Sequence, residues 1–304
     1  MDFQHIIEKI YHEVKPQLGK GKVANYIPAL ANINPNKIGI AVATIDGNIF
    51  TVGDTEDNFS IQSISKVFTL TLAFQKLGDK LWERVGREPS GNAFNSLVQL
   101  EYENGKPRNP FVNGGALVIT DILTQLFPDT STEILHLIQE VSGNKDIRID
   151  EEIAKSELET SDRNFALAYF MKSYKNIDSN IDVLMHNYTN QCAVTMNCVD
   201  LARSFIYLAN HGLNATNNRQ ILTMSQAKRI NSIMITSGLY NESGDFAFRV
   251  GMPSKSGVGG GIVSIIPQKL AISCWSPELN QFGNSLIGIE VMERFTTYSG
   301  ISIF

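Results

Sequence analysis

Residues 63–77 read Ser-Ile-Ser-Lys-Val-Phe-Thr-Leu-Thr-Leu-Ala-Phe-Gln-Lys-Leu. Apolar side chains in this stretch fall on nearly every face of a helix, whereas a surface helix carries them on one stripe. A helix that is apolar all round is a buried helix. We therefore expect residues 63–77 to form the central helix of the fold.

The segments on either side of this helix differ in pattern. Upstream, helical spacing over residues 3–14 is followed by two apolar runs, 37–45 and 48–52, joined by Asp46-Gly47, a strong hairpin signal. Downstream, helical patterns dominate from about 79 to 238, and strand patterns then return. We expect helices over 130–142 (with a Thr130–Glu133 capping box), 162–174, 200–211, 225–236 and 284–298, and strands over 247–252, 256–266 and 270–275.

This order of elements predicts an α+β fold with a central antiparallel sheet built from both chain ends and flanked by helices. We expect a single domain over residues 1–304. Its sheet lobe would comprise about 1–78 and 239–304, and its inserted helical lobe about 79–238. A site would then lie between the lobes, where the buried helix begins.

Composition excludes several classes of function. The net charge is −5 and no run of Lys or Arg is present, which argues against nucleic acid as a partner. Cys192, Cys198 and Cys274 form no Cys-x-x-Cys pair, so we expect buried, reduced thiols and neither a disulfide framework nor a zinc site. The sequence has no secretory signal pattern and no membrane span of ~20 apolar residues, which predicts a cytoplasmic protein without a membrane partner.

The central helix opens with Ser63-Ile-Ser-Lys66, a Ser-x-x-Lys element that places hydroxyl and amine on one helix face. The free N–H groups and the dipole of a helix start favour negative charge, and burial lowers a lysine pKa, which together would make Lys66 a base for Ser63. Alternatively, Ser63 caps the helix and Lys66 reaches solvent. The same pattern occurs at Ser142–Lys145 and Ser225–Lys228, in ordinary surface contexts, so context must decide.

A second element is Lys255-Ser-Gly257-Val258, which continues into Gly259-Gly-Gly261. Glycines in a strand often mark the close approach of a ligand or another backbone. A Val258 N–H that points toward Ser63 would complete a two-donor oxyanion hole. The alternative is a glycine-rich bulge at a sheet edge.

With these motifs in view, the chain resembles the serine-dependent glutaminase family, whose catalytic domain is similar in fold to β-lactamases and penicillin-binding proteins. The resemblance covers nearly the whole chain. It rests on segments that include Tyr26-Ile-Pro-Ala-Leu-Ala31, Gln62-Ser63-Ile-Ser-Lys66, Asn109-Pro-Phe-Val-Asn113, Ser156-Glu157, Ser161-Asp-Arg-Asn164, Tyr188, Ser237-Gly-Leu-Tyr240, Lys255-Ser-Gly-Val258 and Cys274-Trp-Ser-Pro277.

The resemblance implies hydrolysis of L-glutamine to L-glutamate and ammonia through a γ-glutamyl-serine intermediate, with Ser63 as nucleophile and Lys66 as base. It implies catalytic roles for Tyr188, Tyr240 and Val258 as well. The implied substrate-binding positions are Tyr26, Gln62, Ser63, Asn113, Glu157, Asn164, Tyr188, Tyr240 and Val258. No metal or cofactor is implied, and a homotetramer is expected because family members commonly form one.

Two positions depart from the family pattern, which has alanine at Gly114 and glycine at Ser161. Two other functions compete with the glutaminase interpretation. A β-lactamase or peptidase would share Ser63 and Lys66 but normally carries a signal peptide. A non-catalytic glutamine-binding scaffold would need neither residue.

Overall fold

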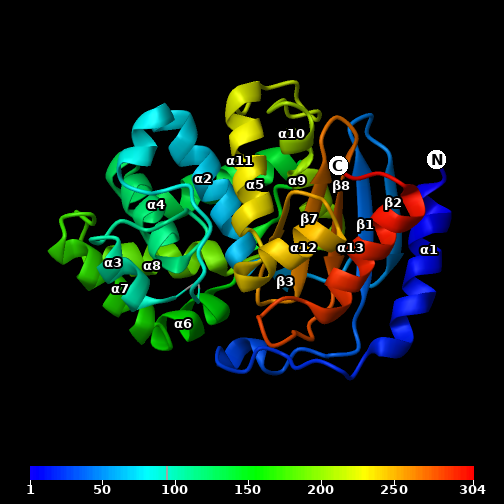
Figure 1. Ribbon diagram of the computed structural model, residues 1–304, viewed down its shortest axis with the longest axis horizontal. Helices are drawn as coiled ribbons and strands as arrows, with labels where there is room; N and C mark the ends of the chain where they lie inside the picture. The colour runs from blue at the N-terminus through cyan, green and yellow to red at the C-terminus, as the bar shows by residue number, and fades with distance from the viewer. Residues whose placement is uncertain (94) are drawn as a thin grey trace.

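The computed structural model describes residues 1–93 and 95–304. A five-stranded antiparallel sheet, in the order β2-β1-β8-β7-β6, takes strands from both ends of the chain, which confirms the predicted fold class. Helices α1 and α13, also from opposite chain ends, pack together beside this sheet (Figure 1). The strands of this sheet are β1 (Gly39–Thr44), β2 (Ile49–Gly53), β6 (Ser254–Ser256), β7 (Gly261–Ile266) and β8 (Leu270–Trp275).

Most of the remaining helices gather on the other side of the sheet, whereas α12 packs in the apolar cluster of α1 and α13 (Figure 1). A small three-stranded sheet consists of β3 (Phe59–Ser60), β5 (Val194–Met196) and β4 (Arg148–Ile149). The helices are α1 (Phe3–Val14), α2 (Ser65–Leu77), α3 (Leu97–Tyr102), α4 (Asn113–Leu126), α5 (Thr130–Ser142), α6 (Glu151–Glu159), α7 (Asp162–Ser173), α8 (Ile181–Cys192), α9 (Cys198–Ser204), α10 (Ile206–Ala209), α11 (Met224–Ser237), α12 (Ser243–Arg249) and α13 (Leu286–Ser299).

Both faces of the large sheet are buried, against different partners. Along β1, Ile40 and Val42 pack in a cluster with α1 and α13, whereas Ala41 and Ala43 join the larger core that the helical region fills. The alternation follows from the two-residue period of a strand. The predicted 46–47 turn joins β1 to β2 as a hairpin.

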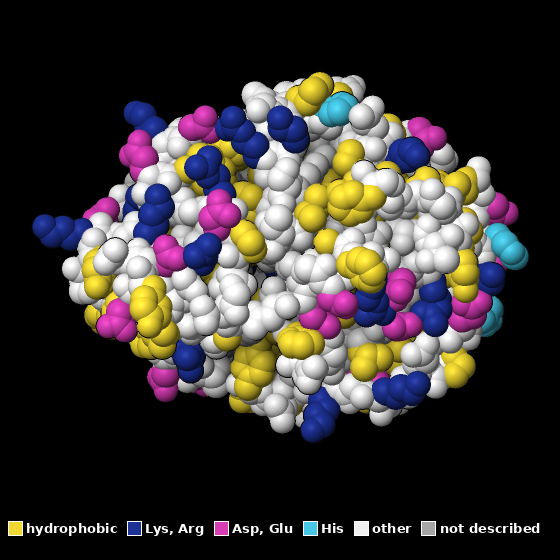
Figure 2. All heavy atoms as spheres, in the orientation of Figure 1, with side chains coloured by type: hydrophobic (Ala, Val, Ile, Leu, Met, Phe, Trp, Pro, Cys, Tyr) yellow, Lys and Arg dark blue, Asp and Glu magenta, His cyan; other side chains and the backbone are white. Residues whose placement is uncertain are grey.

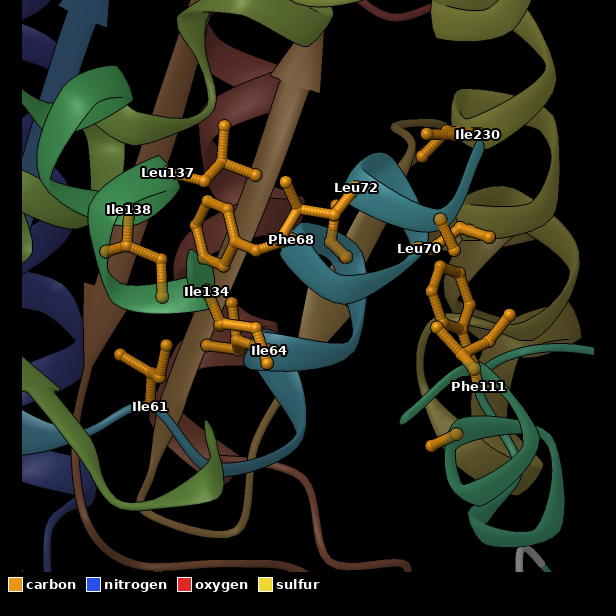
Figure 3. Close-up of a cluster of buried hydrophobic side chains, with 14 of the residues drawn as sticks. Ile61, Ile64, Phe68, Leu70, Leu72, Phe111, Ile134, Leu137, Ile138 and Ile230 are labelled. Carbon is orange, nitrogen blue, oxygen red and sulfur yellow. The ribbon is translucent and has the colours of Figure 1, made fainter. Parts of the chain in front are cut away.

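Helix α2 lies at the centre of the larger core, as its apolar pattern predicts. Every residue from Ser65 to Phe74 is buried. Side chains leave the helix in different directions: Phe68 lies toward Leu137 of α5, while Leu70 lies toward Phe111 (Figure 3). The start of α2 is therefore fixed from several sides.

Two predicted elements are wrong in type or extent. Residues 247–252 were predicted as a strand, but 243–249 form α12, because Phe246 and Val250 are buried at a helical spacing and Arg249 pairs with Asp245 one turn away. The helix predicted over 200–211 is broken into α9 and α10. The Ser204 hydroxyl donates to the Leu201 carbonyl at the break, a side-chain bond that competes with regular helix bonding.

Two further details differ. The strand predicted over 256–266 is a turn followed by β7, and its glycines form the connection from β6. The capping box predicted at Thr130 is absent from α5, since the side chain of Asp129 caps the helix by accepting from the Thr132 N–H. The prediction missed Asp129 as the stronger acceptor, one residue earlier.

Other sequence expectations concern surface and composition. All three cysteines are free and buried, as predicted. Among the described residues, no helix has the length and apolar character needed to cross a bilayer. On the face shown in Figure 2, basic and acidic side chains are interspersed.

Candidate active site

A pocket of about 300 Å³ opens where α2 begins, as the fold-level prediction expected. Its walls come from the sheet side of the molecule and from helices α4, α6, α7 and α8. All nine positions predicted to bind substrate line it: Tyr26, Gln62, Ser63, Asn113, Glu157, Asn164, Tyr188, Tyr240 and Val258. Of the predicted catalytic residues, only Lys66 lies behind the wall.

Ser63 stands on a short 3-10 turn, Gln62–Ile64, that leads directly into α2. The helix thus begins two residues later than predicted. Between residues 59 and 74, Ser63 is the one residue that is not buried, and it lines the pocket together with Gln62. Ser63 interacts with the Tyr240 phenol, which lowers the pKa of Tyr240 against the larger rise that burial causes.

Lys66 is 1% exposed, which rules out the alternative in which its amine reaches solvent. The amine donates to the Phe111 carbonyl at 3.1 Å and to Asn113 Oδ1 at 2.7 Å. Burial lowers the pKa of Lys66 to about 8, so that the neutral amine is accessible near neutral pH. Within the described residues, these two acceptors and not Ser63 hold the amine in the resting structure.

Glu157 is an almost completely buried carboxylate. Burial raises its pKa to about 7, and hydrogen bonds with Gln62 and Cys192 oppose that rise. Within the described residues, its Oε2 atom has no hydrogen-bond partner although it is shielded from solvent. A buried acceptor in this state is suited to a cationic group of a ligand.

Asn113 and Asn164 form a linked amide pair. Asn113 accepts from Lys66 through Oδ1 and donates through Nδ2 to Asn164 Oδ1 at 3.0 Å. The amide N–H groups of Asn164 are then its remaining donors, and its side chain lines the pocket. This chain of hydrogen bonds connects the amine of Lys66 to the pocket wall.

Three helices direct uncapped N-termini at the pocket. In the described part of the chain, six helices of eight or more residues are capped by a side chain at their start, namely α1, α5, α6, α8, α11 and α13. The three long helices without such a cap are α2, α4 and α7. Helix α4 begins at the pocket residue Asn113, α7 begins directly after the pocket residue Ser161, and α2 begins two residues after Ser63. Their free N–H groups favour negative charge in the pocket.

The glycine-rich turn after β6 packs on the backbone that precedes Ser63. A Cβ added to Gly257 would lie 2.3 Å from the Ile61 carbonyl oxygen, and one added to Gly259 would lie 2.2 Å from that of Ser60. The predicted close approach is therefore to another backbone. Among the described residues, no acceptor takes the Val258 N–H.

The three predicted tyrosines occupy different depths. Tyr26 is 57% exposed at the mouth, whereas Tyr188 is buried. Burial raises the pKa of both Tyr188 and Tyr240 above the ordinary value, so both phenols are protonated at neutral pH. Each is a hydrogen-bond donor rather than a base.

Sequence reasoning missed five lining residues: Ile27, Asn95, Thr160, Ser161 and Arg163. Ser161 donates to the Glu157 carbonyl at 2.6 Å, and Arg163 donates to the Asn95 carbonyl at 3.0 Å. Ser161 and Arg163 belong to the segment Ser161-Asp-Arg-Asn164, on which the family resemblance rests, but Asn95 belongs to no motif that the sequence analysis identified. At Gly114, an added Cβ would lie 3.3 Å from a methyl carbon of Leu100 and 3.6 Å from the sulfur of Met171.

Comparisons with known proteins agree with this geometry. Among solved structures, the probable glutaminase ybaS superposes on this chain with a TM-score of 0.95 at 34% identity. The match covers 99% of this chain and 97% of that structure's chain. The probable glutaminase of Bacillus subtilis has a TM-score of 0.91 at 32% identity, and the match covers 99% of this chain and 97% of that one. The fold and site thus define a protein of the β-lactamase-like class.

Sequence relatives narrow this class. The glutaminase of Aliarcobacter butzleri is 54% identical over the full length of both chains, and that of Paraburkholderia phytofirmans is 50% identical, again over both full lengths. The profile of the family described as Glutaminase matches residues 21–304. The chain belongs to the glutaminase family, and its function is that of a glutaminase, the hydrolysis of L-glutamine to L-glutamate and ammonia.

Proposed function

We propose that this glutaminase works by a two-step acyl transfer on Ser63. In the first step, the Ser63 oxygen attacks the side-chain carbonyl carbon of glutamine while its proton passes to the neutral amine of Lys66. The carbon–nitrogen bond then breaks, a proton reaches the leaving nitrogen, and ammonia departs. Water hydrolyses the γ-glutamyl ester in the second step, which releases glutamate and restores Ser63.

The observation that carries this proposal is the setting of Ser63. Ser63 is the only residue between 59 and 74 that is not buried, and it is one helical turn from Lys66, whose pKa burial lowers to about 8. The rival sequences at Ser142 and Ser225 lack this setting. Ser142 bonds to the Gln139 carbonyl away from the pocket, and Ser225 is exposed.

We assign the proton donor for the leaving ammonia to Tyr240. Its hydroxyl interacts with Ser63 and is protonated at neutral pH, since burial raises its pKa. That hydroxyl thus lies next to the bond that breaks. The N–H groups of Ser63 and Val258 would hold the oxyanion, supported by the uncapped start of α2.

The remaining lining residues suit the zwitterionic head of glutamine. The unsatisfied Oε2 of Glu157 is the acceptor for the α-ammonium. Asn113 and Asn164, near the uncapped starts of α4 and α7, are donors for the α-carboxylate. One relative of this fold, at 31% identity over 97% of this chain and a TM-score of 0.90, has been solved in its glutamate form.

Replacement of the nucleophile tests the mechanism. Ser63→Ala should leave thermal unfolding unchanged and lower ammonia release from glutamine by several orders of magnitude, because no second hydroxyl takes the proposed place. A glutamine analogue with an electrophilic side-chain carbonyl should label Ser63. The matched controls are Ser142→Ala and Ser225→Ala, which remove the serine of the other Ser-x-x-Lys sequences and should keep full activity. Labelling of either serine would overturn the assignment.

Three broader expectations belong to the proposal. The chain would act as one catalytic domain in the cytoplasm, as a homotetramer, and without metal or organic cofactor. The described residues contain no cluster of three or more His, Cys, Asp or Glu side chains that could hold a metal. Light scattering of the purified protein measures the molar mass of the assembly, and a mass that differs from that of four chains would exclude the tetramer.

A further inference from the structure

Lys255 is a second buried lysine beside the pocket, and the acyl-transfer cycle gives it no task. Its side chain is 0% exposed on β6, the edge strand of the large sheet. The amine donates to the Gly238 carbonyl at 3.0 Å and to the Ser256 carbonyl at 2.6 Å. Burial lowers its pKa well below the ordinary value, with the charge of Lys66 as a second cause. Burial of an amine is costly, so its retention calls for a physical explanation.

The same amine lies against Tyr240. Its Nζ atom is 4.7 Å from the centroid of the Tyr240 ring and 5.9 Å from that of Phe111. Phe111 is also the residue whose carbonyl accepts from Lys66. Lys255 thus packs between Tyr240, whose hydroxyl is the proposed proton donor, and Phe111, whose carbonyl accepts from the proposed base Lys66.

The backbone at Tyr240 needs support. Tyr240 has a φ of +50°, a left-handed conformation that bulky residues rarely adopt and that persists only when the surroundings enforce it. Two residues earlier, the Gly238 carbonyl accepts from Lys255 and also from the Ser256 N–H at 3.3 Å. Gly238 itself is pressed onto β6, where an added Cβ would lie 1.8 Å from the Ser254 carbonyl oxygen.

We propose that Lys255 is a positioning residue for Tyr240: its amine ties the Gly238 backbone to β6 and packs on the phenol ring, which keeps the Tyr240 hydroxyl on Ser63. The inference rests on the proposed function, in which that hydroxyl protonates the leaving ammonia. A displacement of ~1 Å at a reacting group can cost ~10²-fold in rate. Loss of the amine should therefore reduce kcat rather than glutamine binding.

A double-mutant cycle tests this coupling, with kcat and KM measured for wild type, Lys255→Met, Tyr240→Phe and the double variant. Lys255→Met keeps the volume of the side chain but removes both hydrogen bonds. We expect kcat to fall about 10- to 100-fold with KM changed less than about threefold. In the Tyr240→Phe background, the same substitution should lower kcat by less than about threefold, since the hydroxyl that Lys255 positions is gone.

Lys106→Met is the control, because its amine also donates to a backbone carbonyl, that of Trp82, and neither Lys106 nor Trp82 lines the pocket. It should leave both constants unchanged. If Lys255→Met does not fold, Lys255→Gln, which retains an amide donor, replaces it in the same cycle. Equal losses of kcat in both backgrounds, or unchanged kcat, would overturn the positioning role. The Ser63→Ala assay distinguishes the two proposals. If Ser63→Ala loses ammonia release but the cycle shows no coupling, only the positioning role of Lys255 fails and the acyl-transfer mechanism stands.

Discussion

At the scale of single residues, burial shifts two pKa values toward neutrality from opposite sides. The pKa of Lys66 falls to about 8 and that of Glu157 rises to about 7, in both cases chiefly because the charged form loses its hydration. The proposed roles need a neutral amine and an ionised carboxylate. Both forms predominate together only when the pH exceeds the two values.

The pH dependence of turnover tests Lys66. As a base, its amine must be neutral, so kcat/KM, which reports ionisations of the free enzyme, should fall as the pH drops through about 8 and should level off above it. Lys66→Arg should lose nearly all activity, because a guanidinium does not deprotonate at usable pH. Steady-state kinetics from pH 6 to 10 measure both effects. A pH-independent kcat/KM, or an active Lys66→Arg variant, would contradict a general-base role.

The second residue-scale prediction concerns the carboxylate. Its folded-state pKa lies above the ordinary value of 4.5, so Glu157 lowers stability increasingly as the pH rises from about 4.5 to 7. Glu157→Gln should therefore unfold at the same or a higher temperature at pH 8. It should raise the KM for glutamine about 10- to 100-fold, as expected for loss of one charge-assisted contact. Unchanged KM would remove Glu157 from the ammonium site.

At the scale of elements, the turn between β6 and β7 sets the position of the 3-10 turn that carries Ser63. Gly257 and Gly259 allow two backbones to approach more closely than any side chain permits. Gln62, next to the nucleophile, has a φ of +49° in this contact region. The conformation at Ser63 thus depends on a segment almost two hundred residues away in the sequence.

A pair of glycine substitutions tests this contact. In Gly257→Ala, the methyl group would lie 2.3 Å from the Ile61 carbonyl, so the two segments must separate. We expect a lower melting temperature and at least a tenfold loss of kcat. Gly244→Ala is the matched control, because an added Cβ meets nothing within 4 Å on α12, and it should be neutral or slightly stabilising. Normal kcat in Gly257→Ala would show that the turn does not shape the site.

At the scale of the whole molecule, the pocket draws its walls from distant parts of the chain. Tyr240 and Val258 come with the C-terminal strands, whereas Asn113, Glu157 and Asn164 come with the helices between the two halves of the sheet. A ligand that contacts residues from both parts of the chain binds only when the two parts are folded together. Its binding energy then adds to the stability of the fold.

Thermal unfolding of Ser63→Ala in the presence of glutamine measures this linkage without turnover. At 100 times Kd, a ligand that binds only the folded state adds about 2.7 kcal/mol, so the melting temperature should rise by several degrees. Asparagine, one methylene shorter, should give a much smaller shift, and Ser63→Ala/Glu157→Gln should lose most of the glutamine shift. Equal shifts for glutamine and asparagine would refute a pocket that fixes both ends of the substrate.

Local patterns were sufficient for much of this molecule. Helix α2, the β1–β2 hairpin and strand β8 follow from apolar periodicity and turn residues, because those signals act between positions a few residues apart. The ordered motifs around Ser63, Glu157 and Val258 also identified the family and nine of the residues that line the pocket.

Other properties depended on tertiary structure alone. The pKa of Lys66, the unsatisfied oxygen of Glu157 and the contact of Lys255 with Tyr240 arise from burial by residues far away in the chain, which no local pattern encodes. The same reason explains the error at α12. Its apolar residues fit a strand and a helix alike, and the ion pairs of Arg249 with Glu290 and Glu293 on α13 form only in the folded structure. Local spacing determines which elements can form, but dehydration and close approach are set only when distant segments pack together.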